Sequence, residues 1–177
     1  IDSLDQIHIS YQDRNADELE YIMFDGSSWS SPIVLDGVVG SYAIRYEISM
    51  AFDANDNLHI SYYQNTQGQL KYITKNSTGS WSSPSILFAS NLPGHLNDMA
   101  INSKGEIHVM YHKQTNPPTL AHIYHDGSAW TTAQYGVGGL FTGTMHSIAF
   151  DSEDNLHTSY YSPSPANNLK YSKASPI

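Results

Sequence analysis

The chain has 177 residues, a net charge of −9 and 14% charged residues, against roughly 25% in an ordinary soluble domain. Its eight Lys and Arg form no run, which argues against a nucleic-acid surface or a basic membrane-binding patch. The absence of Cys excludes disulfides, thiol nucleophiles and thiolate metal sites, and no apolar stretch reaches the ~20 residues that span a bilayer. Neutral hydrogen-bonding residues replace the missing charges, so we expect a secreted or cell-surface protein.

A His followed three residues later by Tyr recurs at intervals of about 50 residues, a period typical of propeller blades. The four copies are His8–Tyr11, His59–Tyr62, His108–Tyr111 and His157–Tyr160. An acidic or Asn-rich turn precedes each copy, and a short Leu-centred strand follows it. Three copies then reach a Trp. The sequence therefore consists of four related units.

The second unit shows the strands of one repeat most clearly. A short apolar run predicts a strand at 49–52, and alternation of apolar and polar residues predicts one at 58–63. Two further strands are expected at 70–74 and 81–88. Asn- and Gly-containing turns separate them. Pro84 cannot donate to a central ladder, so the last strand suits an outer edge. These strands predict one four-stranded antiparallel blade.

We therefore predict an all-β propeller, formed by a single domain or domain segment, 1–177. Its repeat units are 1–51, 52–100, 101–149 and 150–177. The first unit lacks an inner strand and the last lacks an outer one, so fourteen strands are expected. Three arrangements remain open: a segment of a longer propeller, an imperfect four-bladed ring, or a ring completed by a second copy of the chain.

Residues that recur once per blade are expected to build the frame, because a catalytic group is needed only once. The histidines should hydrogen-bond a backbone group or carboxylate of the adjacent blade, and the tryptophans should lie between blades. The set comprises His8, His59, His108, His157, Trp29, Trp81 and Trp130. Equivalent positions in successive blades should lie too far apart to share a metal ion, so no metal site is expected here.

Two of the turns, 53–57 and 151–155, loosely resemble the start of a calcium-binding loop. The Gly and the distal Glu of such a loop are missing. We expect hairpin turns and no cofactor, with a weak surface calcium site as the alternative.

The turn before each Trp resembles the Asp-box, or BNR, repeat of sialidase-like propellers in secreted bacterial proteins, with the pattern S-x-D-x-G-x-T-W. Two repeats keep the Asp, Gly and Trp of this pattern but lack the residue between Asp and Gly. They are Asp25, Gly26 and Trp29 in the first unit, and Asp126, Gly127 and Trp130 in the third. The second unit keeps only Gly79 and Trp81. The resemblance covers the whole chain and implies the fold.

Sialidases of this family bind the substrate carboxylate with three Arg, whereas this chain has only Arg14 and Arg45. The resemblance therefore disfavours an autonomous sialidase. Propeller lectins and propellers that act on polysaccharides remain compatible with it.

The loops that lead into each inner strand vary most between repeats, and they should lie at one mouth of the channel. An Arg, acids, His and an aromatic residue there could hold a sugar by stacking and bidentate hydrogen bonds. These candidate binding residues are Arg45, Tyr46, Glu47, His95, Asn97, Asp98 and His146.

The first functional hypothesis is an extracellular, lectin-like recognition module that binds carbohydrate without catalysis. The second is a glycosidase or polysaccharide lyase, with Glu47 and Asp98 as paired carboxylates or His95 or His146 as a base. The third is a structural segment of a surface protein or assembly. The expected partners are a glycan and either the rest of a longer chain or a second copy.

Overall fold

The computed structural model describes residues 1–37, 44–65, 67–89, 93–113, 119–133, 144–162 and 168–175. It describes the backbone alone at 44–47, 93–95 and 144. The elements found in these residues are β-strands, and no helix among them could cross a membrane.

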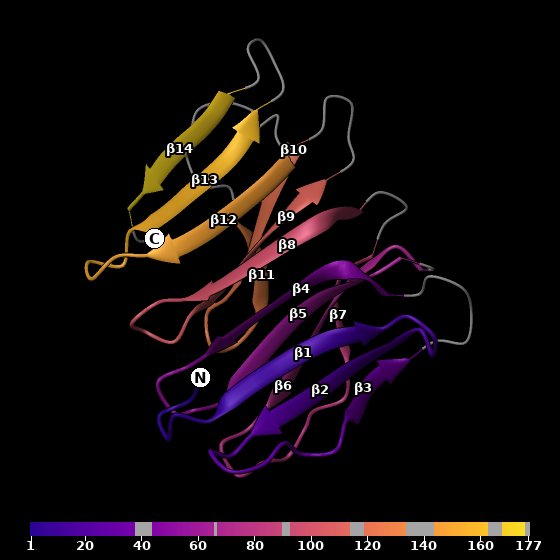
Figure 1. The fold of residues 1–177 in the computed structure, drawn as a ribbon. Helices are drawn as coiled ribbons and strands as arrows, with labels where there is room; N and C mark the ends of the chain where they lie inside the picture. Colours follow the sequence, from indigo (N-terminus) through magenta and orange to yellow (C-terminus); the bar gives the residue numbers. More distant parts are fainter. Residues whose placement is uncertain are drawn as a thin grey trace. The chain divides into compact units, whose positions relative to one another are not determined.

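The first compact unit, Ile1–Asn91, holds two antiparallel sheets in which consecutive strands are neighbours. The first sheet consists of β1 (Ile7–Asp13), β2 (Glu18–Phe24) and β3 (Ile33–Gly37). The second sheet consists of β4 (Ile44–Phe52), β5 (Leu58–Gln64), β6 (Gln69–Lys75) and β7 (Ser85–Ala89). The two sheets meet with β1 beside β4 (Figure 1).

The second compact unit, Leu92–Ile177, repeats this plan. The third sheet consists of β8 (Pro93–Ile101), β9 (Ile107–Lys113), β10 (Thr119–His125) and β11 (Trp130–Ala133). The fourth sheet consists of β12 (Thr144–Phe150), β13 (Leu156–Ser162) and β14 (Asn168–Ala174). Here β8 lies beside β12 (Figure 1).

The predicted all-β class and the fourteen strands are confirmed in the described residues, where the strands form four antiparallel sheets of three or four strands. The first sheet there lacks an inner strand and the fourth lacks an outer one, as the sequence predicts. The outer strand of the second repeat was expected from Trp81, but β7 begins at Ser85. Trp81 makes only an isolated bridge to Lys75. The ladder begins after Pro84 because Pro has no N–H to donate.

Alternating side chains bury one face of each sheet against its neighbour. In the first unit, Leu19 and Tyr21 of β2 belong to the same buried cluster as Leu58 and Ile60 of β5. In the second unit, Leu120 of β10 clusters with Leu156 of β13 and with Ile148. Each unit is therefore held by apolar contact between a Leu-bearing face of one sheet and the facing side of the next.

The inner strands β8 and β12 each contain a register shift at the same place in the repeat. Leu96 has a φ of 75° and Met145 a φ of 54°, which are rare for side chains of this size. Two extra residues in β8 and one in β12 re-aim the side chains that follow, Asn97 and His146. Both of these belong to the candidate binding set.

Candidate functional site

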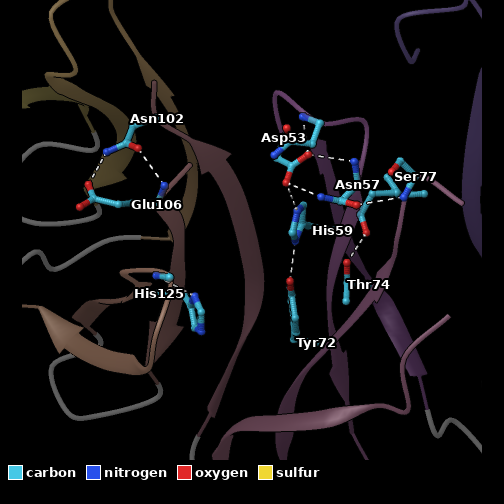
Figure 2. Close-up of polar contacts among 12 residues, drawn as sticks. Asp53, Asn57, His59, Tyr72, Thr74, Ser77, Asn102, Glu106 and His125 are labelled. Carbon is cyan, nitrogen blue, oxygen red and sulfur yellow. Dashed lines mark hydrogen bonds and ion pairs between the residues drawn. The ribbon is translucent and has the colours of Figure 1, made fainter. Parts of the chain in front are cut away.

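Each recurrent histidine contacts polar groups of its own sheet. In the second repeat, Asp53 accepts hydrogen bonds from the backbone N–H groups of Asn55 and Asn57, and its Oδ2 lies 3.5 Å from Nε2 of His59. Nδ1 of His59 lies 2.5 Å from the hydroxyl of Tyr72 on β6 (Figure 2). The carboxylate favours the proton on Nε2, so Nδ1 accepts from the Tyr O–H.

The same unit, which we call the acid–His–Tyr unit, recurs in the first and fourth sheets. His8 lies 3.2 Å from Asp2 and 2.6 Å from the hydroxyl of Tyr21. The fourth sheet contains Asp151, His157 and Tyr171 with contacts of 2.9 and 2.7 Å. These hydrogen bonds connect a turn and two strands of one sheet.

The expected hydrogen bond from these histidines to an adjacent blade is therefore corrected. Strand alternation predicts the face of the sheet on which each His lies, but it does not identify the hydrogen-bond partner. In the structure that partner is the acid six residues earlier, in the turn of the same sheet. The adjacent sheet contacts the ring instead: His8 meets Phe52 edge-on at 4.8 Å, and His108 meets Phe150 in the same way at 4.8 Å. The histidines thus tie the hairpin of their own sheet and contribute apolar contact to the next.

The third repeat replaces two members of the unit. Asn102 stands where the other repeats have Asp, and it bonds Glu106 (Figure 2). His122 replaces Tyr, and its Nε2 lies 3.0 Å from Nδ1 of His108, with the two rings stacked at 13°. Glu106 approaches Nε2 of His108 only to 4.0 Å. The third repeat therefore has a neutral amide where the other repeats have a charged acid, and a second imidazole where they have a phenol.

Burial keeps the paired imidazoles neutral and the tyrosine hydroxyls protonated at neutral pH. It lowers the pKa of His108 to about 4 and of His122 to about 3. It also raises the pKa of Tyr21 and Tyr72 to about 12. A Tyr nucleophile would need a lowered pKa, so these hydroxyls are not activated.

The three tryptophans do not share one environment. Trp81 contacts Tyr21 edge-on at 4.9 Å, between the two sheets of the first unit as expected. Trp29 departs from the expectation: it is 49% exposed, and its ring lies 5.2 Å from Phe24 of its own sheet. Trp130 lies 5.2 Å from His125, also in its own sheet. The repeated position fixes the residue type, while the neighbouring sheet decides its burial.

The Asp-box-like turns are closed by their Asp. Asp25 accepts from the backbone N–H groups of Ser27 and Ser28, both at 2.8 Å, and these bonds lower its pKa to about 2. Asp126 makes the equivalent bonds to Ser128 and Ala129. Gly26 and Gly127 each have a φ of 95°, which a side chain would strain. These motifs act as turns.

The predicted binding residues divide into two groups. The side chains of Arg45, Tyr46, Glu47 and His95 lie outside the described residues. Asp98 accepts hydrogen bonds from Ser147 Oγ and Ile148 N, both at 2.9 Å, and so joins β8 to β12. His146 on β12 donates from Nε2 to the carbonyl of Met110 on β9 at 2.9 Å.

Asn97 follows the bulge in β8 and is half-buried opposite Tyr111. The three described members of the set thus lie where the third and fourth sheets meet, and two of them connect those sheets. In this role, Asp98 and His146 have little capacity left for a ligand.

The turn acids that resembled a calcium loop are engaged in internal bonds. Asp53 and Asp151 accept from their own turn amides and from an Asn side chain. Among the described residues, no group of three His, Asp or Glu is arranged to hold a metal ion.

The sequence reasoning missed a contact between sheets that recurs in both units. The backbone N–H of Ser3 donates to Asp56 at 3.0 Å, and its hydroxyl donates to the same carboxylate. In the second unit, the N–H and hydroxyl of Ser103 donate to Asp154 at 2.8 and 2.5 Å. We call this the Ser–Asp clasp. Ser3 and Ser103 occupy one position of the repeat, and Asp56 and Asp154 another, so the alignment contained the signal.

No family model and no curated protein sequence matches the chain. Among solved structures, an ulvan lyase of polysaccharide lyase family PL25 is 13% identical with a TM-score of 0.65, covering 97% of this chain and 50% of its own. AofleA from Arthrobotrys oligospora is 18% identical with a TM-score of 0.68, covering 96% and 50%. The intramolecular trans-sialidase from Ruminococcus gnavus is 14% identical with a TM-score of 0.58, covering 96% and 40%.

The neighbouring structures have β-propeller-like folds, and the likeness at these identities concerns the fold alone. The chain spans about half the length of the first structures that it matches. The expected sialidase-like architecture is thus supported at the level of fold.

Proposed function

We propose that the chain is an extracellular recognition module that binds carbohydrate without transforming it. The observation that carries this proposal is the division of roles within each repeat. The recurrent acids, histidines and tyrosines form internal bonds in sheet after sheet. The starts of the inner strands differ between repeats, and they carry Arg45, Tyr46 and Glu47 in β4 and His95 in β8, which the sequence had placed in loops. Chemistry that varies on a constant frame suits ligand recognition.

The ionisation of the described groups favours binding over hydrolysis. A glycosidase needs one carboxyl group whose pKa is raised, so that it can protonate the leaving group. Hydrogen bonds instead lower the pKa of Asp25 and Asp126 to about 2. The carboxyl pKa of Asp151 is also lowered, chiefly by the hydrogen bond from His157. These carboxylates stay ionised and serve as acceptors.

Carbohydrate is the proposed ligand class for two reasons. The ulvan lyase was solved with a bound -[GlcA(1-4)Rha3S]- saccharide, and the trans-sialidase also bears a carbohydrate-related name. The variable start of β4 offers an aromatic residue for stacking on a sugar ring and an Arg for bidentate hydrogen bonds to hydroxyls. The saccharide of the ulvan lyase is anionic, whereas the net charge of −9 on this chain disfavours anionic polymers, so the proposal is for neutral glycans.

A glycan array with the purified chain tests the proposal, followed by calorimetric titration of each glycan bound. We expect Arg45→Ala and Glu47→Gln to weaken binding at least about tenfold, equivalent to about 1.4 kcal/mol. Glu153→Gln is the matched control, because it removes the same charge from an exposed turn beyond the opposite end of the inner strand. Equal affinity in all variants, or no binding to any glycan, would overturn the proposal. Cleavage of a bound glycan would assign an enzyme instead.

A further inference from the structure

Two sheet faces at opposite ends of the chain expose apolar side chains. The first face lies on β1 and includes Ile7 and Ile9, which are 40% and 38% exposed. The last face lies on β13 and β14 and includes Tyr161, Leu169 and Tyr171, which are 36%, 80% and 63% exposed. Strand pairing places Tyr161 beside Leu169, and thus on the same side of the fourth sheet.

The equivalent positions are buried where two sheets meet within the first unit. Leu19 and Tyr21 correspond in the repeat to Leu169 and Tyr171, and they are 0% and 2% exposed. Leu58 and Ile60 correspond to Ile7 and Ile9, and both are 0% exposed. All four of these buried residues belong to one cluster. The last face and the first face are therefore the two halves of a contact that the chain already makes internally.

The Ser–Asp clasp supplies an independent second observation. Its donor position holds Ser3, Ala54, Ser103 and Ser152 in the four repeats, and its acceptor position holds Asp5, Asp56, Gly105 and Asp154. Ser3 and Asp56 are joined, as are Ser103 and Asp154. Ala54 and Gly105 have no side chain able to form the clasp. The two members left over are Ser152 in the last repeat and Asp5 in the first.

Asp5 and Ser152 are ready for such a bond. Asp5 has a φ of 60°, close to the 58° of Asp56 and the 60° of Asp154, so its turn presents the carboxylate in the same way. Both Asp5 and Ser152 are exposed. The donor accompanies the last face, and the acceptor accompanies the first face. The last face and the first face are thus complementary both in their apolar side chains and in the hydrogen-bond donor and acceptor beside them.

We propose that the last face of one copy of this chain binds the first face of a second copy, with Ser152 of one donating to Asp5 of the other. In the proposed dimer the same two copies make both of these contacts, which closes the assembly. A second copy is the occupant because the two exposed faces and the pair Ser152 and Asp5 reproduce a contact that this chain makes internally. The dimer does not depend on the proposed glycan binding.

Light scattering of the purified chain gives the first test. We expect the mass of two copies, and dilution should release single copies. A chain that keeps the mass of one copy up to about millimolar concentration overturns the proposal. A mass that keeps rising with concentration indicates an open series of copies and overturns the closed dimer.

One-sided variants test the two faces. Leu169→Glu blocks the last face and Ile9→Glu blocks the first, so each variant alone should be monomeric. An equimolar mixture retains one intact contact and should recover the mass of two copies. Failure of the mixture to associate would overturn the head-to-tail pairing. Lys170→Glu is the matched control, since it introduces the same side chain on the opposite side of β14 and should remain dimeric.

The clasp has its own test, which also guards against misfolded variants. Ser152→Ala should weaken the dimer at least about fivefold, and Asp5→Asn in the same chain should add little, because both act on one bond. Far-ultraviolet circular dichroism and thermal unfolding of the monomers should match those of the diluted wild-type chain. Equal dimer affinity for Ser152→Ala and wild type would remove the clasp from the proposal.

Discussion

The second and third repeats hold the same histidine by different chemistry. His59 lies between the carboxylate of Asp53 and the phenol of Tyr72, whereas His108 stacks on a second imidazole, His122. Both are nearly buried at the same position of their sheets. The comparison shows that packing fixes where the ring lies, while its hydrogen-bond partners can change. The contact in the second repeat includes a charged carboxylate, whereas the contact in the third repeat is neutral. We therefore expect the two repeats to respond differently to pH and to mutation.

Acidification should break the third repeat first, with the largest effect. The pKa values of His108 and His122 are lowered to about 4 and 3 by burial, while the unfolded chain titrates near 6.5. The unfolded chain therefore binds more protons below pH 6.5, and stability falls as pH falls. We expect a loss of about 4 kcal/mol between about pH 8 and about pH 5, measured by denaturant unfolding. His122→Tyr should remove about half of this dependence; an unchanged profile would contradict the assignment.

Removing the ring should cost more in the second repeat. His59→Leu leaves the buried phenol of Tyr72 and the carboxylate of Asp53 without their common partner, with an expected loss of about 3 kcal/mol. His108→Leu leaves only the neutral His122 and should cost about 1.5 kcal/mol. Urea unfolding of both variants at pH 7.5 measures the difference. Equal losses would show that the charge of Asp53 contributes nothing.

The inner strands offer a third contrast. Asp98 of β8 accepts two hydrogen bonds from β12, and Ile148, one of the donors, is buried. Asp98→Ala should destabilise the second unit by about 2 kcal/mol. Ser49 is its counterpart in the second repeat, and Ser49→Ala should cost less than about 1 kcal/mol. Hydrogen exchange of the Ile148 amide should quicken in Asp98→Ala but not in Ser49→Ala.

Conversion of the third repeat into an acid–His–Tyr unit should have the smallest effect on stability. Asn102→Asp with His122→Tyr recreates the partners of His59, and we expect a change below about 1 kcal/mol at pH 7.5. The pKa of His108 should rise, because a carboxylate then stabilises its charged form. Nuclear magnetic resonance titration of the imidazole measures this. A pKa that stays near 4 would show that burial alone sets its value.

Local patterns predicted the strands well because apolar and polar residue types alternate along them, even in β5, where all residues are buried. Leu58 and Ile60 have polar neighbours in the sequence and lie in the core, as period-two alternation requires. The partners of His8 could not be predicted, since its strand position is compatible with a turn acid or with an adjacent sheet. Trp29 and Trp81 occupy equivalent positions of the repeat but differ in exposure. Trp81 packs against Tyr21 of the neighbouring sheet, whereas Trp29 contacts Phe24 of its own sheet.

The candidate site was harder to predict than the frame. Asp98 and His146 were chosen as ligand contacts because they depart from the repeat, yet both connect sheets. The register shifts at Leu96 and Met145 determine where these side chains point, and no residue type in the sequence marks them. The assignments of Arg45, Tyr46, Glu47 and His95 remain predictions.

The left-handed turn residue before each recurrent His limits how the repeats can be rearranged. Asp56 and Asp154 hold a backbone conformation that Gly105 adopts with less strain, and each receives a Ser from the preceding sheet. Moving the third repeat to follow the first would leave the hydroxyl of Ser3 facing a glycine. The order of the repeats is thus encoded in their turns, and an engineer who shuffles them must transplant donor and acceptor together.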